Sequence, residues 1–331
     1  MVKKKIYVGI IGFGKIGQVR YKTLLKNKYV VVSKIYDVNL EKIPNSKKVN
    51  DIDEIFLDKK IESIFICTPN YLNASLTCKG LKLNKNIFCE KPPSISLSEM
   101  KKVISYEKKY KKKLMYGFNH RQHESIIFMK KKIDSGVFGK ILWARGRYGK
   151  SVTESFFKNW RSDKKLSGGG ILIDQGIHML DLLNFFCGNF DIIQSMQSHT
   201  YWKKNIEDNV FLNLKNSKKN ILCSMHSTMT QWRHLFSLEI FLEKGYIALN
   251  GLKTSSNSYG KEKLTFAINR SIPPAAKWTK EKVYTYKIDN SWERETNYFI
   301  DCILKNRKLE HGNSDDALEI MKLIHKIYKQ N

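Results

Sequence analysis

A carboxylate and an imidazole stand four residues apart in a mostly apolar stretch. Asp174 and His178 follow three consecutive glycines, and Asp181 comes three residues later. Positions i and i+4 of a helix share a face, so the two side chains are expected to lie together. Such a pair suits proton transfer at neutral pH. The alternatives are a buried structural histidine, or a metal pair, for which two ligands are too few.

A glycine-rich turn is predicted near the N-terminus, after a strand and at the start of a helix. It reads Gly12, Phe13, Gly14, Lys15, Ile16 and Gly17. Glycines at this spacing allow a tight turn and let backbone N–H groups approach a pyrophosphate. Asp37 ends the next strand, where a carboxylate binds the hydroxyls of the adenosine ribose. We expect NAD as cofactor rather than NADP, whose 2′-phosphate this carboxylate would repel. The alternative is a plain glycine turn beside a surface aspartate.

Two further motifs stand at the ends of predicted strands. They are Cys67-Thr68-Pro69-Asn70 and Glu90-Lys91-Pro92. Ligands of open α/β sheets bind at the carboxyl ends of strands, so both motifs are expected to face one crevice. A lysine there can orient a hydroxyl, and its pKa can fall enough for proton transfer. The chain has 59 basic residues, of which nine are arginine and 50 are lysine. Among so many lysines, only its position at the end of a strand singles out Lys91.

The elements that must position the first motifs alternate along the chain. Strands are predicted at 5–11, 30–36, 63–67, 87–89 and 114–117, and helices at 15–26, 71–83 and 97–110. This alternation is typical of a doubly wound parallel sheet. We predict a Rossmann domain over residues 1–120.

Residues 121–331 show a different pattern. Helices are predicted at 125–135, 171–186, 292–304 and 314–329, and strands through Tyr148 and at 192–200, 210–214, 221–227, 236–243 and 246–249. Consecutive strands without intervening helices predict an α+β domain with an open, mainly antiparallel sheet. Residues 251–282 are expected to be mostly loop. The C-terminal helices can pack back on the first domain.

The net charge of +28 raises nucleic acid or an anionic membrane as a partner. The excess is mostly lysine and is shared by both halves of the chain, whereas phosphate and base recognition favour arginine. No apolar run reaches the roughly 18 residues that a bilayer span requires. Six cysteines without regular spacing indicate neither a zinc site nor a disulfide framework. We therefore expect a cytoplasmic protein with no nucleic-acid partner, no membrane association and no metal.

Together, the motifs GFGKIG, CTPN, CEKP and WRSDKKLSGGGILIDQGIHMLDL, with the acid after the second strand, resemble the Gfo/Idh/MocA family of NAD(P)-dependent oxidoreductases. Glucose–fructose oxidoreductase and inositol 2-dehydrogenase belong to this family. The resemblance implies a Rossmann domain followed by an α+β domain, with a sugar or cyclitol bound between them. It also implies a homodimer or homotetramer formed through the open sheet.

The resemblance implies roles for individual residues. Lys91 would be the catalytic lysine, His178 the acid/base and Asp174 its partner in binding substrate hydroxyls. The cofactor candidates are Gly12, Phe13, Gly14, Lys15, Ile16, Gly17, Asp37, Thr68, Pro69, Asn70, Glu90, Lys91 and Asn119. The substrate candidates are Lys91, Arg121, Trp160, Arg161, Asp174 and His178. Asn73 stands where many relatives have histidine, which removes one possible cofactor-loop contact without affecting the chemistry.

We therefore expect reversible hydride transfer between a nicotinamide and a carbinol carbon of a sugar, cyclitol or nucleotide-sugar. His178 would accept the hydroxyl proton while Lys91 polarises the oxygen. The alternatives are a reductase of a keto, aldehyde or imine metabolite, redox-assisted elimination, and a dinucleotide-binding protein without turnover.

Overall fold

The computed structural model describes residues 5–202, 205–268 and 280–330. The chain forms two compact units. The first comprises residues 1–119, 165–168 and 291–321, and the second residues 120–164, 169–290 and 322–331. Each unit is thus assembled from segments that lie far apart in the sequence.

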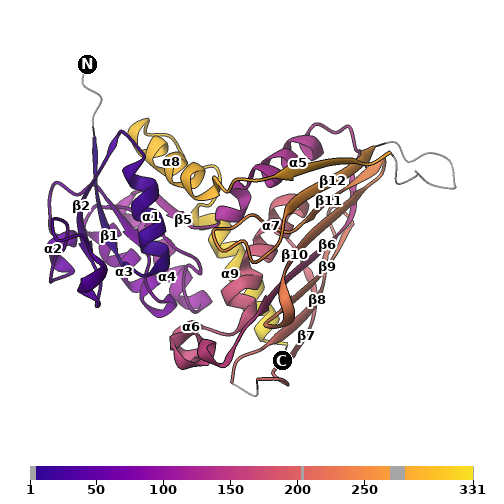
Figure 1. Cartoon of the computed structure of the whole chain (residues 1–331), viewed down its shortest axis with the longest axis horizontal. Coiled ribbons are helices and arrows are strands. Elements are labelled where there is room, and N and C mark those ends of the chain that lie inside the picture. The colour runs from indigo at the N-terminus through magenta and orange to yellow at the C-terminus, as the bar shows by residue number, and fades with distance from the viewer. Residues whose placement is uncertain (1–4, 203–204, 269–279, 331) are drawn as a thin grey trace. The chain divides into compact units, whose positions relative to one another are not determined.

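The first unit contains a five-stranded parallel sheet with the strand order β2-β1-β3-β4-β5 (Figure 1). Its strands are β1 (Ile6–Ile11), β2 (Val30–Tyr36), β3 (Ser63–Ile66), β4 (Asn86–Cys89) and β5 (Leu114–Tyr116). Its first helices are α1 (Lys15–Leu25), α2 (Asp53–Phe56), α3 (Asn70–Lys82) and α4 (Leu97–Tyr110). Apart from α2, which was not predicted, these bounds agree closely with those predicted, and the doubly wound fold is confirmed.

The core of this unit is completed by a helix from the end of the chain, α8 (Ser291–Leu304). Phe65 and Phe88 on neighbouring strands stack with ring centroids 4.8 Å apart, and Phe299 of α8 packs edge-on against both rings. Helix α8 also packs against α1. Parallel strands are apolar on both faces and need cover on both, which α8 helps to provide here.

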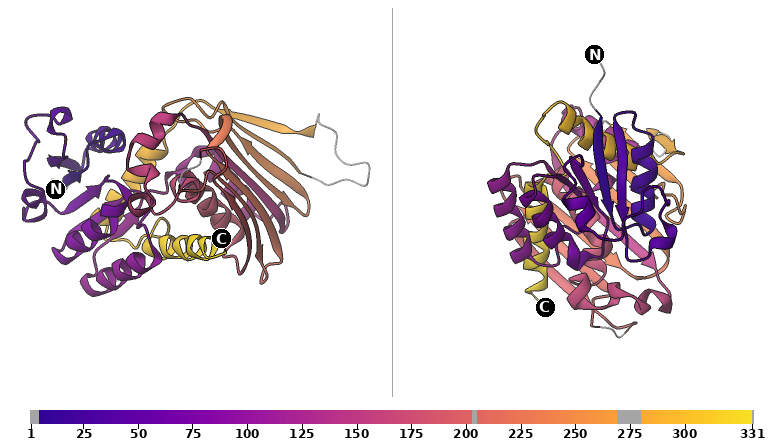
Figure 2. Two further views of the ribbon diagram at one scale, coloured as in Figure 1. Left: turned by 90° about the horizontal axis from the view of Figure 1, so that it is seen from below. Right: turned by 90° about the vertical axis from the view of Figure 1, so that its left-hand side faces the viewer.

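The second unit contains an eight-stranded sheet with the order β13-β12-β11-β10-β6-β9-β8-β7. Its strands are β6 (Ile141–Ser151), β7 (Ile192–Ser198), β8 (Asn209–Asn216), β9 (Ile221–Thr228), β10 (Thr230–Leu242), β11 (Gly245–Asn250), β12 (Glu262–Ile268) and β13 (Lys282–Tyr286). Among the strands that the structure describes in this sheet, only β6 and β9 pair in parallel, so the predicted open, mainly antiparallel sheet is confirmed. Its twist is visible in Figure 2.

The prediction of loop was wrong for residues 262–268, which form β12, and β13 begins at Lys282. Both strands lie near the edge of the sheet and carry charged residues among the apolar ones. Charged residues are common in edge strands, and they weaken the apolar pattern from which a strand is predicted. Residues 269–279, which complete the predicted loop, lie outside the described residues.

Helices α5 (Glu124–Asp134) and α7 (Ile177–Cys187) also belong to the second unit, and α9 (Ser314–Tyr328) ends the chain. Helix α7 packs against β6 and β9. Along β6, the side chains of Ala144 and Tyr148 are buried, whereas those of Trp143, Arg145 and Arg147 are exposed. This period of two gives the sheet one face covered by helix and one open face.

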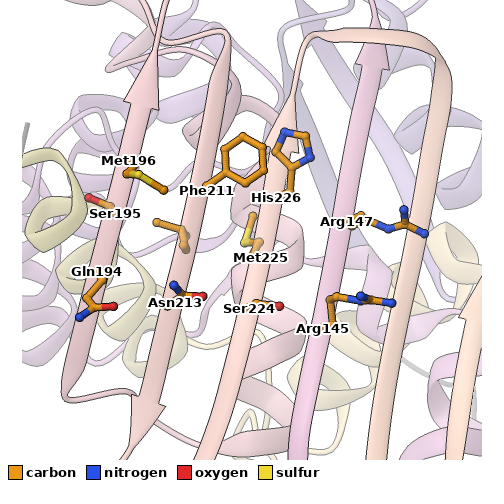
Figure 3. A pocket seen from close by; sticks show the side chains of 11 residues that line it. Arg145, Arg147, Gln194, Ser195, Met196, Phe211, Asn213, Ser224, Met225 and His226 are labelled. Atoms are coloured by element: carbon orange, nitrogen blue, oxygen red, sulfur yellow. The ribbon is translucent and has the colours of Figure 1, made fainter.

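The open face holds a hollow of about 440 Å³ over strands β6 to β9 (Figure 3). Its lining includes Arg145, Arg147, Phe211, Asn213 and His226. None of its lining residues is among the predicted site residues. The chemistry predicted for this chain therefore belongs to other parts of the fold.

Among the described residues, no helix is long and apolar enough to cross a membrane. The same residues contain no group of three or more potential metal ligands. All six cysteines are free, and five of them are buried.

Candidate active site

The glycine turn forms a cradle between β1 and α1. Gly12 has a φ of +90°, and a Cβ there would lie 2.5 Å from the carbonyl oxygen of Cys67. A Cβ on Gly17 would lie 2.0 Å from the oxygen of Gly12, whereas one on Gly14 would meet nothing within 4 Å. Gly14 is the N-cap of α1 and provides no side-chain cap. The turn is therefore tight where it must fold and open at the helix N-terminus, which fits the pyrophosphate of a dinucleotide.

Asp37 lies beside this turn, directly after β2. Its Oδ2 accepts a hydrogen bond from the backbone N–H of Phe13, and its Oδ1 accepts one from the N–H of Asn39 at 2.8 Å. The structure thus brings together two elements that the sequence analysis assigned to one cofactor. Their arrangement fits a dinucleotide whose ribose hydroxyls would reach the carboxylate.

The residues after β3 and β5 make contacts within the first unit. Thr68 donates from Oγ1 to Oδ1 of Asn73 at 3.0 Å, and Asn70, at the start of α3, donates to the carbonyl of Ser167 at 2.8 Å. Asn119 donates to the Ser291 hydroxyl at 3.1 Å. Cofactor contacts by Thr68, Pro69, Asn70 and Asn119 stay predictions.

Lys91 follows β4, and its preceding neighbour is tightly bound. Glu90 is 8% exposed and accepts a hydrogen bond from Nε of Arg20 at 2.7 Å. Lys91 itself is half-buried. The carboxylate of Glu90 therefore serves an internal ion pair, while its role toward a cofactor stays a prediction.

In the second unit, Asp174 lies in a single π-helical turn, Leu172–Gly176, which leads into α7. The helix predicted over residues 171–186 is present at 171–187, but this turn within it is π-helical. A π-helical turn widens the helix locally and occurs often at functional sites. The difference has no signal in the sequence because hydrophobic spacing does not separate one π turn from an α turn.

The start of this turn is anchored by Glu207. Its carboxylate accepts hydrogen bonds from the backbone N–H groups of Gly170 at 2.8 Å and Leu172 at 3.0 Å. The hydroxyl of Tyr328 donates to the same carboxylate at 2.8 Å. Burial raises the pKa of Glu207 above its ordinary value, although these hydrogen bonds act in the opposite direction.

Two cations flank the carboxylate of Asp174. Nζ of Lys150 lies 2.7 Å from Oδ2, and Nε of Arg161 lies 3.8 Å from Oδ1. The Arg161 guanidinium also stacks over the Trp160 ring at 4.4 Å. The structure therefore brings Trp160, Arg161 and Asp174 together as predicted candidates and adds Lys150, which the sequence analysis missed.

The imidazole of His178 lies against a second imidazole. The rings of His120 and His178 stack with centroids 3.9 Å apart and an interplanar angle of 16°. Nε2 of His120 and the Tyr148 hydroxyl are hydrogen-bonded at 2.9 Å. Burial, followed by the proximity of Tyr259 and Asp174, raises the pKa of Tyr148 well above its ordinary value. Tyr148 therefore stays a neutral phenol beside the two imidazoles.

The close approach of α7 to β6 makes these contacts possible. A Cβ on Gly146 would lie 2.5 Å from the sulfur of Met179, so a larger residue at this position would require the Met179 side chain to move. Tyr148 and Lys150 then follow at two-residue steps on the same face of β6. This spacing is the signal by which the sequence could have indicated both residues.

Arg121 and Asp181 form a bidentate ion pair. Nε and Nη2 of Arg121 lie 2.7 and 2.6 Å from the two carboxylate oxygens, and the side chains are 6% and 0% exposed. Arg121 was predicted as a substrate residue, and its guanidinium here serves an internal pair. Its contact with substrate stays a prediction.

The residues predicted for proton transfer belong to different units. Lys91 is part of the first, and Asp174 and His178 are part of the second. Residues 6–118 match the NAD-binding Rossmann fold of the GFO/IDH/MocA oxidoreductase family, and residues 126–248 match the C-terminal domain of the same family. The chain belongs to the Gfo/Idh/MocA family. This confirms the resemblance, and residues 6–118 form the family's NAD-binding domain.

Several members of the Gfo/Idh/MocA family are similar to this chain. D-glucoside 3-dehydrogenase of Escherichia coli is 29% identical over 165 residues, which are 49% of this chain and 46% of that protein. Myo-inositol 2-dehydrogenase of Thermotoga maritima is 27% identical over 188 residues, 55% of this chain and 54% of that protein. The chain thus matches about half the length of these relatives.

The fold is shared over the whole chain. The structure of levoglucosan dehydrogenase in complex with NADH and levoglucosan superimposes with a TM-score of 0.85. The match covers 98% of this chain and 97% of that one, at 19% sequence identity. At this identity the similarity shows that the two proteins share the Gfo/Idh/MocA fold.

Proposed function

We propose that this chain is an NAD-dependent oxidoreductase that acts on a carbinol carbon of a sugar, cyclitol or nucleotide-sugar. The observation that carries the proposal is the glycine cradle, which is open at Gly14 and flanked by the carboxylate of Asp37. Support for a sugar-like substrate comes from relatives named as glucoside and inositol dehydrogenases.

The preference for NAD over NADP rests on Asp37. Its carboxylate is held at the end of β2 by two backbone N–H groups. A 2′-phosphate placed near it would meet an uncompensated negative charge, whereas two ribose hydroxyls would find an acceptor. The cofactor, when bound, supplies the carbon that accepts or returns the hydride.

The roles of the protein residues follow from their chemistry. The Lys91 ammonium polarises the substrate oxygen, and the His178 imidazole accepts the hydroxyl proton. The Asp174 carboxylate accepts hydrogen bonds from neighbouring hydroxyls. Lys150 and Arg161 pair with this carboxylate.

A substrate screen tests this function. The purified chain is incubated with NAD and a panel of sugars, inositols and nucleotide-sugars while the absorbance of NADH is followed. On the substrate so found, Lys91→Ala should lower kcat by about 10²- to 10³-fold, the range expected when one group that stabilises charge on a substrate oxygen is lost, while NADH still binds. The control is Lys79→Ala, on the surface of α3, which should leave kcat unchanged.

Three outcomes contradict the proposal in different ways. Activity that survives Lys91→Ala removes the role assigned to that residue. Dinucleotide binding without turnover across the panel favours a binding protein instead. Turnover only with carbonyl or imine substrates favours a reductase.

We also propose a homo-oligomer formed through the open face of the eight-stranded sheet. This face exposes Trp143, Met196, Phe211 and Leu222, and aromatic pairs run across its strands. Exposed apolar side chains gathered on one face are typical of protein interfaces. The molar mass of the wild type by light scattering should exceed that of the Leu222→Asp variant, and equal masses at the monomer value would contradict it. A cytoplasmic location stays a prediction.

A further inference from the structure

The residues on both sides of Lys91 are held by one buried side chain. Asn73, in α3, is fully buried. Its Nδ2 donates to the carbonyl oxygen of Glu90 at 3.2 Å and to that of Pro92 at 2.8 Å. A single amide group therefore spans the backbone immediately before and after Lys91.

The orientation of this amide is set by Thr68. The Thr68 hydroxyl donates to Oδ1 of Asn73 at 3.0 Å. Because the amide oxygen accepts from Thr68, the NH₂ group faces the two carbonyls. A flipped amide would instead place Oδ1 against the two carbonyl oxygens, where no hydrogen bond can form. The segment after β3, which contains Thr68, and the segment after β4, which contains Glu90, are thereby joined through the first turn of α3.

The carboxylate of Glu90 provides a second anchor. Arg20 is fully buried, pairs with Glu90 and with Glu295 of α8, and places its guanidinium between two rings. The centre of the guanidinium lies 4.3 Å from the Phe88 ring and 4.6 Å from the Trp292 ring. A side chain held in this way cannot follow a movement of Glu90, so it restrains Glu90 in turn.

We propose that Asn73 is a positioning residue for Lys91. It fixes the backbone on both sides of the lysine and so sets the direction in which the amine is presented, with the Arg20–Glu90 pair as the second restraint. The effect of Asn73 on catalysis rests on the proposed function, whereas its effect on the position of Lys91 does not. It replaces the expectation from sequence that Asn73 affects a cofactor-loop contact alone.

The variant Asn73→Asp tests the proposal. Aspartate has the same shape but no N–H donor, so it removes both hydrogen bonds and turns an oxygen toward the two carbonyls. Asn86→Asp is the matched control, because Asn86 begins the same strand β4 and donates to the carbonyl of Glu62 at 3.3 Å. Each variant loses hydrogen bonding from a side-chain amide to a backbone carbonyl. Only the amide of Asn73 bonds the residues next to Lys91.

The main readout needs no substrate. Each lysine is acetylated in trace amounts by acetic anhydride over a range of pH values, and mass spectrometry gives the rate for Lys91 and for the other lysines. In Asn73→Asp the rate profile of Lys91 should change by about threefold or more, while Lys15 and Lys85 keep their wild-type profiles. In Asn86→Asp the profile of Lys91 should equal that of the wild type. An unchanged Lys91 profile in folded Asn73→Asp overturns the proposal.

The catalytic readout separates this inference from the proposed function. With an active substrate, Asn73→Asp should lower kcat by about 10- to 100-fold, in keeping with the cost of small misplacements, and leave the Kd for NADH within about twofold. If the wild type turns over no substrate, the proposed function fails while the acetylation result still decides the role of Asn73. If Asn73→Asp does not fold, Thr68→Val, which leaves the amide in place but removes its orienting hydroxyl, should change the Lys91 profile in the same experiment. An unchanged profile there overturns the proposal.

Discussion

Arg20 and Glu90 form a buried ion pair one residue before Lys91, with Nε and Oε1 2.7 Å apart. Glu295, from the far end of the chain, binds the same guanidinium. The buried guanidinium of Arg20 therefore links α1, the helix that follows the glycine turn, to helix α8. This pair links the stability of the first unit to the segment that carries Lys91.

Removal of Arg20 should destabilise the protein strongly. In Arg20→Met, two buried carboxylates lose their partner, and the cost is about 3–5 kcal/mol in the free energy of unfolding. The measurement is urea unfolding followed by fluorescence. The control is Lys26→Met, because Lys26 and Glu293 pair across the same two helices at 3.0 Å but in solvent. That loss should stay below about 1 kcal/mol, and equal losses in the two variants would contradict the argument.

Asp37 should control the choice between NAD and NADP. In Asp37→Ala, the repulsion of a 2′-phosphate disappears together with the acceptor for the ribose hydroxyls. The ratio of the Kd for NADPH to that for NADH should fall by about tenfold, or roughly 1.4 kcal/mol. Fluorescence titration with both nucleotides measures it. The control is Asp53→Ala, at the start of α2, which should keep the wild-type ratio of the two Kd values. A wild-type ratio in Asp37→Ala would remove the basis for preferring NAD.

Glu262 should stabilise the second unit only above acidic pH. Burial alone would raise its pKa, but the hydrogen bond from His123 at 3.1 Å and the histidine's charge bring the pKa below the ordinary 4.5. The folded state therefore favours the carboxylate. The contribution of Glu262 to the free energy of unfolding is complete above about pH 4.5, the pKa in the unfolded chain. It is lost as the pH falls through the lower pKa that Glu262 has in the folded state.

The measurement is the free energy of unfolding of the wild type and Glu262→Gln between pH 6 and pH 3. The difference between them should shrink as the pH falls. Glu207→Gln is the opposing control, because the pKa of Glu207 is raised and its carboxylate disfavours the folded state as it ionises. The stability of the wild type relative to Glu207→Gln should therefore decline as the pH rises above about 4.5. Parallel curves for the two variants would contradict the assignment.

Lys150 should matter for activity although no motif marked it. In Lys150→Met, Asp174 loses its 2.7 Å partner and can turn away from substrate hydroxyls. We expect kcat/KM to fall by about tenfold or more, with NADH affinity unchanged. Arg145→Met is the matched control, because Arg145 lies on the same strand but on the open face, where it pairs with Glu239 at 2.8 Å. A comparable loss of kcat/KM in both variants would indicate a general effect on β6.

Much of the first unit could be read from the sequence. The glycine turn, the strand ends at Asp37 and Lys91, and the alternation of strands and helices depend on local spacing and on backbone conformations that few residues allow. The same holds for strands β6 to β11 of the second unit, but not for β12 and β13. The division near residue 120 and the roles of the predicted site residues stay predictions.

The tertiary structure decided which side chains meet. Asn73 reaches the backbone around Lys91, Lys150 reaches Asp174, and His120 stacks on His178, although no local pattern connects these positions. Such contacts depend on sheet register and on the distance between packed elements, such as the close approach at Gly146. The sequence by itself predicted a dinucleotide site at the glycine turn and determined which residue types are available for chemistry. Only packing determined which neighbours orient them, because contacts between distant positions are set by the assembled fold and not by spacing along the chain.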